Sequence, residues 1–174
     1  MEGAGFRFDL LRAQDLPLLH GWLLRPHVAQ WWGPAESIDA LHADHVAGQT
    51  APGATLAYIA SLDGSPVGFI QSYVAMGSGD GWWEDVTDPG VRGIDQFLAH
   101  GEQLNRGIGR TMVRAFTAQL LADPAVSLVQ TDPSRDNVRA IRCYAHAGFR
   151  PVREVATPDG PALLMHCLRG DMAW

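Results

Sequence analysis

Apolar and polar residues alternate along several short stretches of the chain and recur at helical spacing along others. Alternation with a period of two is typical of strands, and apolar residues spaced three and four apart are typical of amphipathic helices. The alternating stretches predict strands at residues 6–11, 55–62, 67–74, 94–99, 126–131, 149–156 and 162–168. The helical spacing, with its start and stop residues, predicts helices at residues 14–24, 34–47, 111–121 and 137–147.

Residues that favour turns mark the boundaries of these elements. Pro26 is expected to end the first helix, and Gly148 to end the last one. The dipeptide Asp63-Gly64 predicts a tight hairpin between two strands. Residues 77–93, punctuated by glycine and proline, are expected to be irregular. The first helix is expected to present four apolar residues to a core: Leu18, Leu19, Trp22 and Leu23.

The order of the elements predicts a mixed α/β fold in one domain, residues 1–174. A helix-containing crossover joins two strands in the second half of the chain. The 174 residues suffice for a full core, and no repeat or long linker divides them.

Composition excludes several classes of protein. Hydrophobic residues make up 47% and charged residues 18%, which argues against disorder. The formal net charge of −6 argues against a nucleic-acid partner. No apolar run approaches the roughly 18 residues of a membrane span, and the first residues lack the apolar stretch of a secretory signal. With two cysteines, Cys143 and Cys167, a disulfide scaffold is excluded, and we expect a cytoplasmic protein.

Two motifs could carry chemistry in the second half of the chain. Gly107 and Gly109 precede a predicted helix, where backbone N–H groups and the helix dipole suit an anion such as pyrophosphate. Alone, this pattern is more often a plain glycine-rich turn. Further on, Asn137 is placed to cap a helix, on which Ala140 and Tyr144 share a face. Tyr144 alone could equally be a core aromatic residue with a wet hydroxyl.

Carboxylates and indoles are concentrated between residues 80 and 95. Two further carboxylates, Asp132 and Asp159, directly follow or lie between predicted strands. A cleft of carboxylates and indoles suits a polyamine, because carboxylates pair with ammonium groups and indole faces attract cations. The alternative is a solvated acidic loop, and the adjacent indoles favour the cleft. The residues of the acidic stretch are Asp80, Trp82, Trp83, Glu84, Asp85, Asp88 and Asp95.

The glycine loop and helix, then a strand, then Asn-x-x-Ala-x-x-x-Tyr-x-x-x-Gly-Phe, resemble the GCN5-related N-acetyltransferase (GNAT) superfamily. Within it, the chain resembles the aminoglycoside 6′-N-acetyltransferases of type Ib over about residues 20–166. The resemblance implies a central, mostly antiparallel, splayed sheet flanked by helices, acetyl-coenzyme A as co-substrate and no metal. The blocks that carry it are residues 27–33, 71–75, 77–84, 87–96, 130–134 and 157–161.

The same resemblance implies roles for individual residues in acetyl transfer to the 6′-amine within a ternary complex. Asp95 would take the proton of the amine and Asp80 would orient it, although either carboxylate could be the base. Tyr144 would protonate the leaving thiolate. The implied acceptor contacts are Trp32, Gln71, Trp83, Glu84, Asp132 and Asp159. The implied coenzyme contacts are Gln96, Phe97, Leu98, Arg106, Gly107, Ile108, Gly109, Arg110, Asn137, Ala140 and Tyr144.

Two other functions remain open on the sequence. A GNAT enzyme could act on another amine, such as a siderophore precursor or a polyamine. A protein that only binds aminoglycoside or coenzyme A is the second alternative, but a binder has no need of Asp80, Asp95 and Tyr144 together. The resemblance further implies antibiotic resistance and a monomer or weak homodimer.

Overall fold

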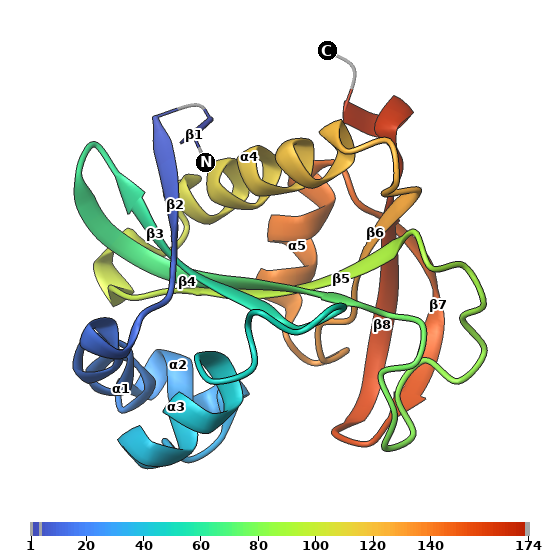
Figure 1. Ribbon diagram of the computed structural model, residues 1–174. Coiled ribbons are helices and arrows are strands. Elements are labelled where there is room, and N and C mark those ends of the chain that lie inside the picture. The colour runs from blue at the N-terminus through green and yellow to red at the C-terminus, as the bar shows by residue number, and fades with distance from the viewer. Residues whose placement is uncertain (1, 4, 173–174) are drawn as a thin grey trace.

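A twisted eight-stranded sheet runs through the computed structural model, which describes residues 2–3 and 5–172 (Figure 1). Its spatial order is β1-β2-β3-β4-β5-β6-β8-β7, and every neighbouring pair is antiparallel except β5 and β6. This confirms the mixed α/β class and the mostly antiparallel sheet. The strands are β1 Glu2–Gly3, β2 Phe6–Leu10, β3 Leu56–Leu62, β4 Ser65–Val74, β5 Val91–Leu98, β6 Leu128–Thr131, β7 Arg150–Thr157 and β8 Gly160–Cys167.

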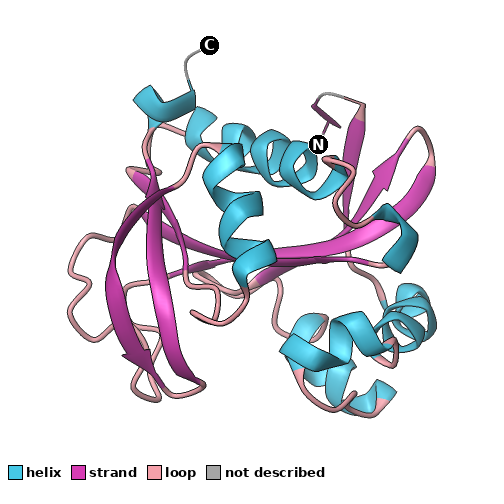
Figure 2. Ribbon diagram, turned by 180° about the vertical axis from the view of Figure 1, so that it is seen from behind, coloured by secondary structure: helices cyan, strands magenta, loops and turns pink. Residues whose placement is uncertain are grey.

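Helices cover both faces of the sheet: the first three helices of the described chain pack on one side, and the last two on the other (Figures 1 and 2). Alternate side chains of β3 point to opposite faces: Ile59 packs with the first three helices, and Tyr58 packs with the residues of α4. None of the helices in the described part of the chain is long and apolar enough to cross a membrane. The helices are α1 Leu16–Leu23, α2 Pro26–Trp32, α3 Ile38–His45, α4 Ile108–Ala122 and α5 Val138–Ala147.

The first two helices differ from the sequence-based expectation. Pro26 does not only end a helix: it is the first residue of α2, a position that suits proline because it needs no amide hydrogen bond. On α1, Leu19, Trp22 and Leu23 are buried as expected, but Leu18 is 41% exposed and Leu16, 1% exposed, takes its place in the core.

Within residues 2–3 and 5–172, β5 and β6 form the one parallel pairing, and it is short. It spans three residue pairs and ends where Gly93 lies opposite Gln130. β5 continues to Leu98 beside β4, whereas β6 ends at Thr131. Figure 1 shows β6, β8 and β7 turned away from the far end of β5. The sheet therefore splays open between two neighbouring strands.

The splay exposes one edge of β5. The N–H of Ala99 donates to the carbonyl of Val67 at 2.8 Å, so odd-numbered residues of this strand direct their backbone polar groups towards β4. Because the direction alternates along a strand, Ile94, Gln96 and Leu98 direct theirs towards the gap. This edge is available to a ligand that can pair with a strand.

Close packing of β4 on β5 and α4 generates a stability prediction. An added Cβ at Gly68 would lie 2.5 Å from the Phe97 carbonyl oxygen and 3.3 Å from the Met112 sulfur. Gly68→Ala should therefore lower the melting temperature by about 5 °C, since overpacking costs about 1–3 kcal/mol. Gly21→Ala, on α1 with nothing within 4 Å, should raise it slightly because alanine favours the helix. Thermal unfolding of both variants tests this, and equal shifts would contradict it.

Candidate functional site

Two cavities adjoin the gap between β5 and β6. One of about 820 Å³, here called the acidic cavity, extends from the gap to the turn between β7 and β8. The other, of about 640 Å³, lies at the start of α4 and is called the arginine cavity. The two cavities meet at residues that line both: Trp31, Trp32, Gln96, Asn137 and Ala140.

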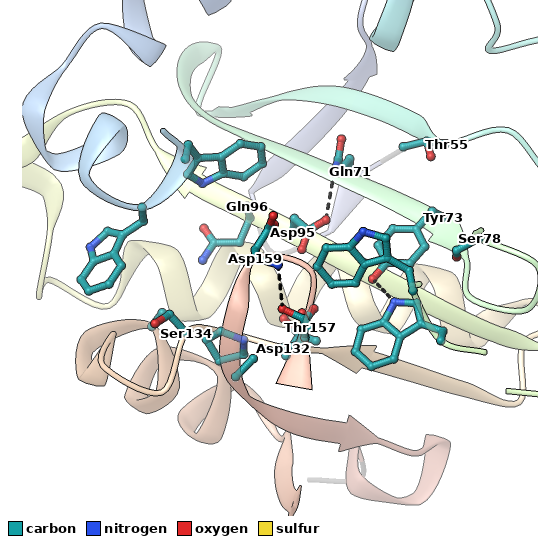
Figure 3. Close-up of a pocket in the computed structure, with 18 of the residues that line it drawn as sticks. Thr55, Gln71, Tyr73, Ser78, Asp95, Gln96, Asp132, Ser134, Thr157 and Asp159 are labelled. Carbon is teal, nitrogen blue, oxygen red and sulfur yellow. Dashed lines mark hydrogen bonds between the residues drawn. The ribbon is translucent and has the colours of Figure 1, made fainter. Parts of the chain in front are cut away.

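Three carboxylates from separate elements converge on the acidic cavity (Figure 3). Asp95 lies on β5, Asp132 directly follows β6, and Asp159 lies in the turn between β7 and β8. Gln71, paired with Asp95 across β4 and β5, donates from Nε2 to the Asp95 Oδ2 at 3.0 Å. That bond fixes the orientation of the Asp95 side chain.

Burial makes two of these carboxylates, Asp95 and Asp132, reluctant to ionise. It raises the pKa of Asp95, and the hydrogen bond from Gln71 opposes that rise. Burial, and then the charges of Asp95 and Asp159, raises the pKa of Asp132 to about 8. A bound ammonium group would relieve this repulsion and restore the ionised forms. The acidic cavity is thus prepared for a polycation.

Aromatic rings form the walls of the acidic cavity. The Trp32 ring meets Phe97 edge-on, with ring centroids 5.1 Å apart. Trp83 packs at 5.9 Å from Trp82 and donates from Nε1 to the Tyr73 hydroxyl at 3.0 Å. These rings offer flat apolar surfaces suited to sugar rings.

Tyr144 lines the acidic cavity from α5. The side chain of Asn137 begins this helix by accepting a hydrogen bond from the N–H of Ala140 at 3.2 Å. Tyr144 is buried, and the side chains of Thr131 and Gln96 partly oppose the effect of burial on its pKa. Burial raises the pKa of Tyr144 far above its usual value, so the hydroxyl stays protonated and can act as a proton donor.

The arginine cavity surrounds the N-terminus of the fifteen-residue helix α4. Gly107 caps this helix in the left-handed conformation, with φ 81°. The positive end of the helix dipole and the nearby cations suit an anion such as a pyrophosphate. On the other side, the cavity reaches the open edge of β5, where the Leu98 carbonyl accepts from His27 Nε2 at 2.9 Å. The cationic side chains are Arg106, Arg110, Arg139 and Arg142.

Most of the residues implied by the sequence resemblance line one of the two cavities. In the acidic cavity these are Trp32, Gln71, Trp83, Asp95, Asp132, Tyr144 and Asp159. In the arginine cavity they are Gln96, Phe97, Leu98, Arg106, Gly107, Gly109, Arg110, Asn137 and Ala140. Ile108 does not line it and packs against the core cluster instead. Asp80 and Glu84 are exposed, and neither lines a cavity described here.

Of the carboxylates in the stretch from residue 80 to 95, Asp95 lines the acidic cavity, together with the neighbouring Trp82 and Trp83. The implied contacts of Asp80 and Glu84 with the acceptor stay predictions. Two other carboxylates of this stretch hold the loop in place. Asp85 accepts from Arg153 on β7 at 2.8 Å. Asp88 accepts from the N–H of Gly90 at 2.7 Å and from the Ser127 hydroxyl at 2.6 Å.

Comparisons with known proteins agree with this architecture. The family model described as "Acetyltransferase (GNAT) domain" matches residues 12–157. The chain therefore belongs to the GNAT acetyltransferase family. Two relatives called aminoglycoside N(6′)-acetyltransferase type 1, from Klebsiella pneumoniae and Serratia marcescens, are 50% identical to this GNAT chain over 159 residues. The aligned region covers 90% of this chain and 79% of each relative.

Solved structures show the same fold for this GNAT chain. A structure of AAC(6′)-Ib in complex with paromomycin and acetyl-CoA superimposes with a TM-score of 0.91 at 47% identity. The match covers 96% of this chain and 95% of that one. A structure of AAC(6′)-Ib with coenzyme A and kanamycin gives a TM-score of 0.90 at 47% identity, covering 95% and 96%. The resemblance drawn from the sequence motifs is confirmed.

Some residues of this GNAT site were not expected from the sequence. Tyr73 lies two residues after Gln71 on β4, so the period of two already places both on one face. Arg139 and Arg142 are three apart on α5 and share a helical face. Among the described residues, no group of three or more histidine, cysteine, aspartate or glutamate side chains is placed to hold a metal ion.

The raised pKa of Asp132 predicts how the stability of the ligand-free protein depends on pH. Between pH 4 and 8 the folded state holds a proton that the unfolded state releases, so stability falls as the pH rises. Asp132→Asn removes this penalty. Its melting temperature should exceed that of the unmodified protein by several degrees at pH 8, and the excess should shrink towards pH 4. Thermal unfolding across that range measures it, and a difference that does not change with pH would contradict the prediction.

Proposed function

We propose that this GNAT protein transfers the acetyl group of acetyl-coenzyme A to the 6′-amino group of aminoglycoside antibiotics and so confers resistance. One observation carries the proposal: a carboxylate-lined cavity meets an arginine-lined cavity at the open edge of β5. The first suits a polycationic acceptor and the second an anionic coenzyme. Relatives that are about half identical carry the name of this activity.

The arginine cavity is assigned to acetyl-coenzyme A. Its pyrophosphate would bind the backbone N–H groups around Gly107 and Gly109, with Arg106 and Arg110 beside it. The amides of the pantetheine arm would pair with the open edge of β5 at Gln96 and Leu98. This path directs the thioester to the junction of the two cavities, where Gln96 lines both of them.

The acidic cavity is assigned to the aminoglycoside. Asp132 and Asp159 would pair with ammonium groups, while Trp32 and Trp83 pack against sugar rings. Gln71 holds Asp95 in place beside the reacting amine. Asp80, which is exposed in the ligand-free structure, would orient the same amine or act as the base in place of Asp95, and the exposed Glu84 would contact the acceptor.

The chemistry is a direct transfer within a ternary complex. The acceptor amine has a pKa near 10 in water, so it arrives protonated and must lose a proton before attack. Asp95 takes that proton, directly or through water, and its raised pKa improves it as a base near neutral pH. The neutral amine then attacks the thioester carbonyl.

The tetrahedral intermediate carries a negative oxygen. The backbone N–H of Gln96 faces the gap and would stabilise this oxyanion, an effect worth roughly 3 kcal/mol. When the carbon–sulfur bond breaks, Tyr144 donates a proton to the coenzyme thiolate, and the second proton of the attacking nitrogen, lost as the amide forms, restores the Tyr144 hydroxyl. A thiol of pKa about 8.5 is a fair leaving group already, so this donation helps only modestly. Amide product and free coenzyme then leave.

Two acceptors that differ at the 6′ position test where the acetyl group is transferred. Release of free thiol from acetyl-coenzyme A should accompany kanamycin A, which has a 6′-amine. Paromomycin, which has a hydroxyl there, should give no turnover. Turnover with both would place the acetyl group elsewhere. Turnover with neither would favour another amine, such as a siderophore precursor or polyamine, or a protein that only binds.

Variants of Asp95 and Asp159 should affect different steps, the first the chemical step and the second the binding of the acceptor. Asp95→Asn should lower kcat by about a hundredfold or more, because the base is lost while the shape is kept. Asp159→Ala should mainly raise KM for the aminoglycoside. Steady-state kinetics measures both effects. An unchanged kcat in Asp95→Asn would remove the proposed base, and Asp80→Asn would then be the variant expected to lose turnover.

A further inference from the structure

Tyr73 lines the acidic cavity, and its ring fits there because the residue opposite it on the next strand has no side chain. It lies on β4 opposite Gly93 of β5, two residues before Asp95. An added Cβ at Gly93 would lie 2.0 Å from the Cζ atom of Tyr73. The ring of Tyr73 therefore lies over β5, in the space that a side chain at position 93 would fill.

A strained residue holds the hydroxyl of that ring. Trp83 has φ 53°, in the left-handed region that bulky side chains rarely adopt, and its side chain is buried. Such strain persists only where the surroundings require it. Here the conformation brings the indole Nε1 to 3.0 Å from the Tyr73 hydroxyl oxygen (Figure 3).

This contact decides which hydrogen bond Tyr73 can offer. The indole N–H donates to the hydroxyl oxygen, so the hydroxyl proton is free to be donated in turn. Burial, followed by the charges of Asp95 and Asp132, raises the pKa of Tyr73, so it keeps that proton. Ionised carboxylates only accept, and they recognise ammonium groups. A fixed tyrosine donor instead binds an oxygen acceptor, and the oxygen atoms of an amino sugar are uncharged hydroxyl and ether oxygens.

We propose that the Tyr73 hydroxyl donates a hydrogen bond to a hydroxyl group on the sugar ring that carries the reacting amine, and so helps to determine acceptor specificity. The position of Tyr73 indicates which ring it would contact. Tyr73 lies opposite Gly93, next to Asp95, whose carboxylate would take the proton of the reacting amine. The inference rests on the proposed function.

Tyr73→Phe tests the proposal, because it keeps the ring over Gly93 and removes only the hydroxyl. Three acceptors with the same 6′-amine form a matched series. Kanamycin B has both the 3′- and the 4′-hydroxyl, tobramycin lacks the first, and dibekacin lacks both. Loss of one uncharged hydrogen bond should raise KM for kanamycin B about five- to tenfold, with kcat and the KM for acetyl-coenzyme A unchanged. With dibekacin the variant and the unmodified protein should have the same KM.

Tyr58→Phe is the matched control. Tyr58 is buried in β3 against Phe116, with ring centroids 5.4 Å apart, and lines neither cavity described above. It should leave every KM unchanged. A Tyr73→Phe penalty that is equal for kanamycin B, tobramycin and dibekacin would overturn the proposal, as would no penalty at all. Absence of turnover by the unmodified protein with all three acceptors would instead refute the proposed function.

Discussion

β5 has β6 beside it for only three residue pairs, and the site exists because that pairing stops. Had the parallel ladder continued past Gly93, the backbone groups of Ile94, Gln96 and Leu98 would be used within the sheet. Unpaired strand edges are costly when buried, since each N–H and C=O needs a partner. Here His27 satisfies the Leu98 carbonyl, and the remaining edge lines the two cavities. A local defect in sheet pairing becomes the place where two substrates can meet.

The second constraint is electrostatic. Three carboxylates converge at the splay. None of the arginine ion pairs found among the described residues involves any of the three. Burial and mutual repulsion raise the pKa values of Asp95 and Asp132, which costs stability near neutral pH. The same cost favours a cationic ligand, because ammonium groups supply the missing charge. Specificity for a polycation and a weakened ligand-free fold are therefore two consequences of one arrangement.

The sequence predicted most helices and strands, but it predicted only some of the residues that lie close together in the site. Local signals were sufficient for the glycine loop, the Asn137 cap and most strands, since each depends on neighbouring residues. The carboxylates of the acidic stretch have different partners: Asp95 lines the acidic cavity, whereas Asp85 binds Arg153 and Asp88 binds Ser127. Asp132 and Asp159 reach the site from separate segments, and only the splay of the sheet brings them to Asp95. Tyr73 was missed for a related reason, because its role depends on the space above Gly93 on another strand.

The short helix α2 shows why the two cavities belong to one site. Trp31 and Trp32, at its C-terminal end, line both of them. Its N-terminal end is fixed to the end of β5: His27 donates to the Leu98 carbonyl, and Arg25, which precedes the helix, donates to the Ala99 carbonyl. The strand edge assigned to the coenzyme therefore also sets the position of the indoles that wall the acceptor. One end of α2 is thus bonded to the end of β5, and the indoles at its other end line both cavities, so one short helix joins the strand edge to the walls of the acceptor cavity.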